Sequence, residues 1–235
     1  MSIHKKFSSL LTTITIIIIM LTIITIYTKR SEITWVNAII PISSVTTNKN
    51  IVAIACNVYE GNEELTKIIK VLNKENVRIS FFIGGTWAYK NPEVLLMLKN
   101  NKQDIQNHGY YHKRPSTLNK QNNIKEIKDT ENYIYKITNV KTTLFEPPYG
   151  DYDENALSII NSIGYKVITW SIDTIDWRQD ASQDIILKRI EKKLHPGAII
   201  LTHPKKVTSK SIEGIIRMLK NKGYEITTVS DLIQK

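Results

Sequence analysis

Short, continuous apolar runs alternate with longer amphipathic stretches from residue 51 to the end of the chain. A continuous apolar run is typical of a strand buried on both faces, and apolar residues spaced three or four apart are typical of a helix. This pattern predicts strands at 51–56, 78–83, 104–107, 143–145, 166–172, 198–202 and 224–228. It predicts helices at 63–75, from Pro92 onward, and at 121–138, 153–163, 182–194 and 209–222, followed by a last helical turn.

The alternation amounts to about seven β/α units, which predicts a parallel sheet covered by helices. An open, doubly wound sheet and a closed barrel both satisfy it. Polar residues help to choose, because they follow the predicted strands at His108, Tyr149, Asp173, Asp176 and His203. In a barrel these positions converge on one face, where barrel enzymes keep their catalytic groups. The sequence therefore favours an α/β fold with a (β/α)7-type barrel.

The N-terminus departs from this pattern, because residues 7–28 are 22 consecutive positions without a charge. Two lysines precede the segment, and Lys29 and Arg30 follow it. At about 1.5 Å per residue, a helix of this length matches the ~30 Å apolar core of a membrane. The exit lacks the Ala-x-Ala pattern of a cleaved signal peptide. Residues 1–30 are therefore predicted to be an uncleaved signal anchor with one transmembrane helix, and a cleaved signal is the alternative.

Residues 31–50 contain Pro41 and a polar stretch at 43–48, and we expect them to form a linker. Residues 51–235 then form the folded domain. The anchor would hold this domain at the cell membrane, as a single-pass protein with the domain outside the cytoplasm.

Charge and cysteine content narrow the function classes. Lysine and arginine number 32 against 22 acidic residues, giving +10, and four of the basic residues lie before residue 31. The remaining excess is scattered, which favours anionic surroundings such as a phosphate-bearing cell wall. The sequence contains no Arg-rich cluster or zinc finger, so nucleic acid is not an expected partner. The single cysteine, Cys56, excludes an intrachain disulfide and a Cys-cluster metal site.

The candidate chemistry lies in a constellation of histidines and carboxylates. His108 and His112 are four residues apart, and on one helical turn they would share a face and could bind a divalent metal. Each histidine alone would more often be an ordinary loop residue. Together with His203 at another strand end and Asp176 to orient it, they suit metal-assisted hydrolysis. The carboxylate would fix the tautomer of His203, which could protonate a leaving group.

Several motifs in residues 51–233 resemble those of one family, the polysaccharide deacetylases, or NodB-homology domain of carbohydrate esterase family 4. The matching segments are His108-x-x-x-His112, Pro147-Pro148-Tyr149-Gly150, Asp173-x-x-Asp176-Trp177, Leu201-x-His203 and Ser80-Phe81-Phe82. The resemblance implies a distorted β/α barrel that removes N-acetyl groups from a cell-wall aminosugar polymer, either peptidoglycan or a chitin-like glycan. It implies zinc or a similar divalent metal on His108 and His112.

The same resemblance implies roles for other residues. His203 and Asp176 would be catalytic, and the glycan would contact four residues, Pro148, Tyr149, Trp177 and Leu201. Two departures from the family pattern concern the catalytic base. Asn57 stands at the position of the base and Val58 at that of the third metal ligand, while Glu146 replaces the arginine that pairs with the base. The run that begins at Asn57 resembles a divergent branch found in spore-forming bacteria.

Three hypotheses follow from these departures. The protein could remain a deacetylase, with Glu60, Glu63 or Glu146 as a surrogate base or ligand. It could be a catalytically silent barrel that binds cell-wall glycan, with the metal weakly bound or absent. It could instead be a membrane-anchored scaffold, related to sporulation, in which the barrel is only structural.

Overall fold

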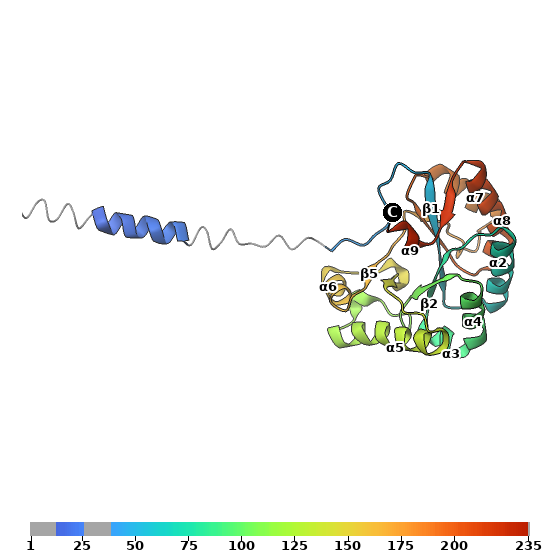
Figure 1. Cartoon of the computed structure of the whole chain (residues 1–235), viewed down its shortest axis with the longest axis horizontal. Coiled ribbons are helices and arrows are strands. Elements are labelled where there is room, and N and C mark those ends of the chain that lie inside the picture. Colours follow the sequence, from blue (N-terminus) through green and yellow to red (C-terminus); the bar gives the residue numbers. More distant parts are fainter. Residues whose placement is uncertain (1–12, 26–38, 235) are drawn as a thin grey trace, which may run out of the picture. The chain divides into compact units, whose positions relative to one another are not determined.

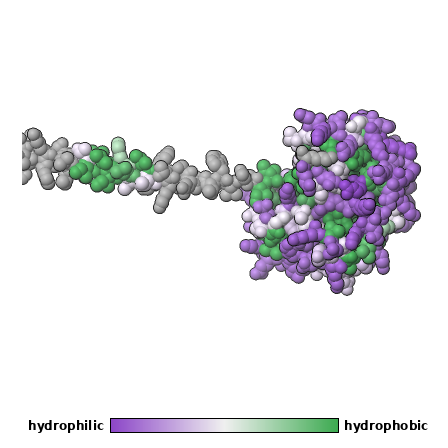
Figure 2. All heavy atoms as spheres, in the orientation of Figure 1, coloured by the Kyte–Doolittle hydropathy of each residue, from purple (hydrophilic) through white to green (hydrophobic). Residues whose placement is uncertain are grey.

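The structure is a computed structural model that describes residues 13–25 and 39–234. The chain divides into two units, Met1–Ala38 and Ile39–Lys235. In the first unit residues 13–25 are helical, and Figure 2 shows that mainly apolar side chains cover them. The hydroxyls of Thr22 and Thr25 donate to helix carbonyls at 2.8 and 2.9 Å, which satisfies these polar groups within the helix.

The predicted anchor is longer than this helix. Residues 7–12 and 26–28 lie outside the described residues, and so do residues 1–6 and 29–38. In the described part of the chain, no helix has both the length and the apolar character needed to cross a membrane. The transmembrane anchor therefore stays a prediction.

The second unit contains a parallel sheet of eight strands (Figure 1). The strands are β1 (Ile51–Val58), β2 (Ser80–Ile83), β3 (Asp104–Asn107), β4 (Leu144–Phe145), β5 (Lys166–Val167), β6 (Ile172–Asp173), β7 (Ile199–Thr202) and β8 (Glu225–Thr227). Their order is β5-β4-β3-β2-β1-β7-β6, and β8 pairs with the start of β1. The predicted α/β class with parallel strands is confirmed.

Helices cover the outside of the strands, as Figure 1 shows for α7, α8, α2, α4 and α5. The helices are α2 (Asn62–Lys74), α3 (Gly85–Lys90), α4 (Pro92–Asn100), α5 (Lys120–Thr138), α6 (Glu154–Ser162), α7 (Gln183–Lys193), α8 (Lys206–Asn221) and α9 (Val229–Leu232). Two 3-10 turns, Pro115–Thr117 and Pro148–Gly150, lie in the loops. Side chains of Asn119, Asp153 and Ser182 accept from backbone N–H groups at the starts of α5, α6 and α7.

The sheet curls towards a barrel but does not close through strand pairing. The predicted strand at 166–172 is two strands, and β5 and β6 lie at opposite edges of the sheet. Only residues 168–171 separate them, so the two edges must lie near each other. Residues 39–50 lie across this opening, where Ile42 bridges Ile168 and Ser44 bridges Ala198. The compact unit therefore begins at Ile39, inside the segment that the sequence pattern indicated as a linker.

The two faces of β1 serve different cores, because successive side chains of a strand point to opposite faces. Ile51, Ala53 and Ala55 pack inside the sheet with Phe82 and with residues of α9. Val52, Ile54, Cys56 and Val58 pack between the sheet and the helices. Asn57 continues the inner series at the carboxyl end of the strand. This alternation sends Asn57 towards the mouth of the barrel and Val58 into the apolar layer outside it.

Candidate active site

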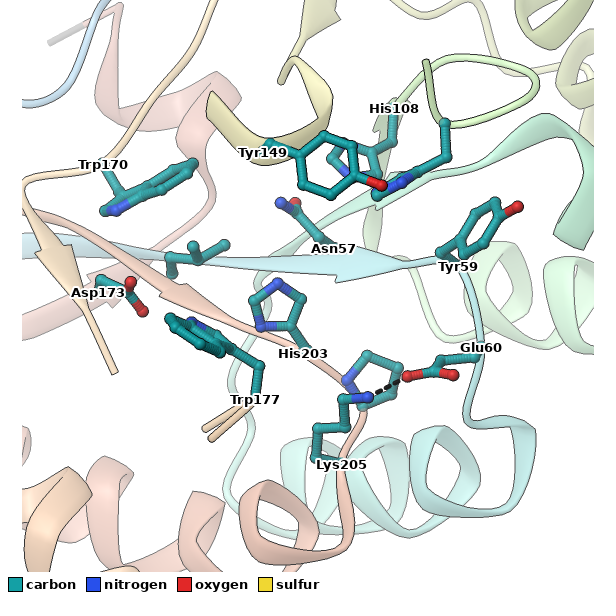
Figure 3. A pocket seen from close by; sticks show the side chains of 13 residues that line it. Asn57, Tyr59, Glu60, His108, Tyr149, Trp170, Asp173, Trp177, His203 and Lys205 are labelled. Atoms are coloured by element: carbon teal, nitrogen blue, oxygen red, sulfur yellow. Dashed lines mark hydrogen bonds and ion pairs between the residues drawn. The ribbon is translucent and has the colours of Figure 1, made fainter. Parts of the chain in front are cut away.

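A cavity of about 560 Å³ opens at the carboxyl ends of the strands. Figure 3 shows side chains from several loops pointing into it, with Asn57 and His203 near its centre. Its lining is Asn57, Tyr59, Glu60, His108, His112, Tyr149, Trp170, Asp173, Trp177, Leu201, His203, Pro204 and Lys205. The structure thus brings seven of the ten sequence-predicted site residues to one cavity. The other three, Asp176, Glu146 and Pro148, are buried beside it.

His203 is held by Asp176, as the sequence predicted. Nδ1 of His203 lies 2.7 Å from Oδ1 of Asp176, and the backbone N–H of His203 donates to Oδ2 at 2.7 Å. Thr208 donates to the same Oδ2 at 2.5 Å. Because a carboxylate can only accept here, Nδ1 carries the proton and the Nε2 side remains available to the cavity. Asp176 is buried, and it fixes both the tautomer and the ring orientation of His203.

The two remaining histidines come together through a loop rather than through a helical turn. His108 directly follows β3, and the chain turns at Gly109 (φ 80°) and at His112 (φ 58°). The imidazole rings lie 5.0 Å apart, edge to face. Nδ1 of His108 donates to the backbone oxygen of Glu146 at 2.6 Å, which leaves Nε2 without a proton.

Burial keeps these two imidazoles neutral. It lowers the pKa of His108 to about 3, with His112 as a further cause. Burial also lowers the pKa of His112, and the neighbouring His203 and Arg114 lower it further. Neutral imidazoles are the form that binds metals. Two good donors are therefore present.

A third protein ligand, which catalytic zinc sites normally have, is missing from this part of the cavity. The described residues contain no group of three histidine, cysteine, aspartate or glutamate side chains arranged to hold a metal ion. Val58 is fully buried in the helix-facing apolar layer. The ring of Tyr59 lies 4.5 Å from that of His112, where it covers one face of this imidazole. The donor set does not fit a catalytic zinc ion.

Asn57 and Glu146 form a buried pair below the cavity. Nδ2 of Asn57 donates to Oε1 of Glu146 at 2.7 Å. Among the described residues, Oδ1 of Asn57 and Oε2 of Glu146 have no hydrogen-bond partner. Burial raises the pKa of Glu146 to about 8, and the bond from Asn57 only partly offsets this. Glu146 is thus largely protonated at neutral pH, and its pairing partner is an amide. The amide of Asn57 cannot take up a proton, and Glu146 is fully buried and does not line the cavity, so neither is placed to act as a general base on a substrate.

Other carboxylates are placed differently. The side chain of Glu63 is 81% exposed and pairs with Lys67 at 2.6 Å, and it does not line the cavity. Glu60 does line the cavity, and it forms an ion pair with Lys205 across the rim (Figure 3). Of the three surrogates that the sequence suggested, only Glu60 faces the space a substrate would fill.

Aromatic side chains surround the mouth of the cavity. Tyr149 is 60% exposed and Trp177 is 56% exposed, and Tyr59 and Trp170 complete the rim. Two of the lining residues, His112 and Tyr149, have positive φ angles, and so does Ile175 next to Asp176. Such conformations persist where the surrounding structure holds them, and they are common at binding sites. Sequence reasoning missed Trp170 and Lys205 because nothing local distinguishes them from a core tryptophan and a surface lysine.

Comparisons with known proteins agree with this geometry. A family model for polysaccharide deacetylase matches residues 44–168, more than half of the chain. The uncharacterized protein YlxY of Bacillus subtilis is 32% identical over 195 residues, which are 83% of this chain and 61% of YlxY. The peptidoglycan-N-acetylglucosamine deacetylase of Bacillus cereus is 29% identical over 192 residues, 80% of this chain and 70% of that protein.

Among solved structures, wild-type BA3943 of Bacillus anthracis, a CE4 family pseudoenzyme, matches with a TM-score of 0.80. The two chains are 33% identical over 83% of this chain and 69% of that one. A mutant of BA3943 with restored enzymatic activity has also been solved. The family match, the open parallel barrel and the motifs at its mouth lead to one conclusion: this chain belongs to the polysaccharide deacetylase family.

Proposed function

We propose that this protein binds a cell-wall aminosugar glycan and that its N-deacetylase activity is lost or strongly reduced. The observation that carries the proposal is the Asn57–Glu146 pair. It replaces a basic carboxylate and its arginine partner with an amide and a buried carboxyl group whose pKa is about 8. General-base help is worth roughly 10²–10⁴-fold, so a site without it is slow even if everything else is in place.

The rest of the cleft supports glycan binding. Exposed aromatic rings such as Tyr149 and Trp177 offer a flat apolar face and a polar group at the ring edge. A sugar ring can stack its C–H face on such a ring while its hydroxyl groups bond to the polar edge. His203 keeps its carboxylate partner and faces the cavity. The similarity to a peptidoglycan deacetylase supports peptidoglycan as the glycan class, and the similarity to a CE4 family pseudoenzyme supports reduced activity.

Two parts of the proposal concern the metal and the cell envelope. His108 and His112 alone would hold a divalent ion weakly, because the anionic ligand of the family pattern is replaced by Val58. Residues 7–28 would anchor the protein in the membrane, with the folded domain outside the cytoplasm, where the glycan lies.

The test uses the full chain in detergent with peptidoglycan oligosaccharides. Binding is measured by calorimetry and deacetylation by acetate release. We expect binding without detectable acetate. Acetate release at a rate typical of enzymes would overturn the proposal, and absence of both binding and release would favour the scaffold hypothesis.

A restored variant sharpens this test. Asn57→Asp, Val58→Asp and Glu146→Arg together would return the base, the third ligand and the arginine. We expect zinc affinity to rise, and acetate release to rise by at least about a hundredfold. Asn57→Asp alone is the matched control, because its carboxylate would lie beside Glu146 without a counter-charge. Val58→Asp places a carboxylate in an apolar layer, where an unpaired charge is costly. The triple variant should therefore be folded in the presence of zinc, which can pair with this carboxylate.

A second candidate function is deacetylation with Glu60 as the surrogate base. One observation favours it, namely that Glu60 lines the cavity. Its ion pair with Lys205 disfavours it, because the ammonium group of Lys205 already occupies the carboxylate at the rim.

A further inference from the structure

A second hollow adjoins the cleft. It has a volume of about 410 Å³ and shares Tyr59, His112 and Tyr149 with the cleft. Its other walls come from the neighbours of His112 in the chain, namely Tyr111, Lys113 and Arg114, and from Thr117. The shared wall makes the two hollows continuous. One sugar residue of a chain in the cleft would therefore place its neighbour, or a substituent of that neighbour, in the second hollow.

The second hollow is basic. Lys113 and Arg114 line it, and no carboxylate is among the described residues that do. The guanidinium of Arg114 lies 4.1 Å above the ring of Tyr149, so it is held over the boundary between the two hollows. Lys113 is in none of the ion pairs between described residues, although its charge acts on Glu126, which lies beneath the loop.

Two carboxylates lie nearby, and other partners occupy both. Asp151 accepts from the backbone N–H and the hydroxyl of Ser116 at 2.9 and 2.7 Å. Its contact with Arg114 is long, at 3.5 Å, and leaves most guanidinium donors free. Glu126 is buried under the loop and accepts from the backbone N–H of Tyr111 at 2.8 Å. The loop thus presents cationic donors to the hollow and keeps its carboxylates beneath.

We propose that this basic subsite, formed by Lys113 and Arg114, binds an anionic substituent on the sugar next to the one in the cleft. The inference rests on the proposed glycan function and narrows it to aminosugar polymers that bear a carboxylate or a phosphate. The planar guanidinium of Arg114 matches either group with two parallel hydrogen bonds, and Lys113 adds a second charge. A neutral chitin-like chain would offer neither cation an anionic group to bind.

The experiment compares four tetrasaccharides on the full chain in detergent at low salt. One is the alternating N-acetylglucosamine–N-acetylmuramic acid tetrasaccharide, one its methyl ester, one the neutral N-acetylglucosamine tetramer and one its 6-phosphorylated form. We expect the acid or the phosphate to bind about tenfold more tightly than the two neutral sugars. The tighter of the two anionic sugars identifies the source of the anion.

Variants then assign the effect to the subsite. Lys113→Gln and Arg114→Gln should each weaken binding of the anionic sugar and leave the neutral tetramer unchanged. Arg217→Gln is the matched control, because Arg217 is also an exposed arginine paired with a carboxylate, Glu213, but lies on α8. Lys113→Gln guards against an indirect effect through the aromatic rim, because Arg114 is the residue of the two that stacks over the ring of Tyr149.

Two results would overturn the inference in distinguishable ways. Equal affinity for all four sugars, or an equal loss for all four in both variants, would reject the anionic subsite while glycan binding stands. Failure of the unaltered protein to bind any of the four would reject the proposed function and the subsite together.

Discussion

The two sides of the cleft treat a buried carboxyl group in opposite ways. On one side Asp176 accepts three hydrogen bonds, two from His203 and one from Thr208. On the other side Glu146 receives a single bond from Asn57, and two polar atoms of the pair have no partner in the described chain. Both carboxyl groups are almost inaccessible to solvent. Burial is therefore the same for both, and the two environments differ in how many hydrogen bonds each carboxyl group accepts.

The two sides differ in chemical role: one orients the imidazole of His203, and in the family pattern the other would activate a water molecule. The Asp176 side still orients an imidazole towards the cavity, which is useful for contacting a sugar whether or not a bond is broken. The Asn57 side lacks the carboxylate and arginine that the family pattern has there. Under the proposed function, the cleft keeps its shape and its polar contacts without the groups that would activate water.

The largest effect should come from breaking the Asp176 network. Asp176→Ala leaves the N–H of His203 and the hydroxyl of Thr208 without their acceptor in a buried place. We expect a loss of about 3 kcal/mol in the free energy of unfolding, measured by urea denaturation. Thr208→Val removes one donor only and should cost about 1 kcal/mol. Equal losses in the two variants would contradict the idea that Asp176 organises this side.

The Asn57 side should reveal itself in the pH dependence of stability. Glu146 has an ordinary pKa of 4.5 and about 8 in the folded chain, so folding favours its protonated form. Its contribution is fully present below pH 4.5 and is lost as the pH rises towards 8. His108 has an ordinary pKa of 6.5 and about 3 when folded, so its contribution is lost as the pH falls below 6.5.

Between pH 4.5 and 6.5, Glu146 and His108 change the free energy of unfolding in opposite directions as the pH rises. Above pH 6.5, of these two groups, only Glu146 still changes it. We expect the unaltered protein to lose up to about 2 kcal/mol between pH 6.5 and 8, at about 1.4 kcal/mol per unit. Glu146→Gln should abolish this loss, because a glutamine can both accept from Asn57 and donate to it. Urea denaturation at the two pH values measures the difference. An unaltered protein whose stability does not change over this range would show that Glu146 is ionised.

The sequence predicted much of the fold because β/α alternation is local. Apolar runs and helical spacing placed most elements within a few residues of their observed bounds. The short helix Gly85–Lys90 was not predicted, because Gly84 and Gly85 suggest a break rather than a helix start. Residues 39–50 were predicted to be a linker, but they pack against the barrel. Their bridges reach Ile168 and Ala198, more than 120 residues away in the chain, so no local sequence pattern could indicate this packing.

In the site, too, local sequence predicted some features and not others. The pairing of Asp176 with His203 was predicted correctly. The burial of Val58 in the outer apolar layer was not predicted, because the direction of its side chain depends on the register of β1 and on the helices packed over it. The aromatic rim and the basic hollow are also built from separate loops, so only the folded chain reveals them.

The smallest effect concerns an ion pair that joins the two sides at the rim. Glu60 follows Asn57 in the chain and Lys205 follows His203, and their ion pair crosses the cleft entrance. Their side chains are 62% and 36% exposed, so solvent screens the attraction. Glu60→Gln should therefore change the free energy of unfolding by no more than about 1 kcal/mol, and it should leave acetate release undetectable, as in the unaltered protein. Glu63→Gln is the matched control, because Glu63 is also an exposed, lysine-paired glutamate but points away from the cavity. If the unaltered protein does release acetate, and Glu60→Gln abolishes the release while Glu63→Gln does not, then Glu60 is the surrogate base. In that case the catalytic carboxylate has moved from the strand end to the rim, and the two sides of the cleft work together in catalysis.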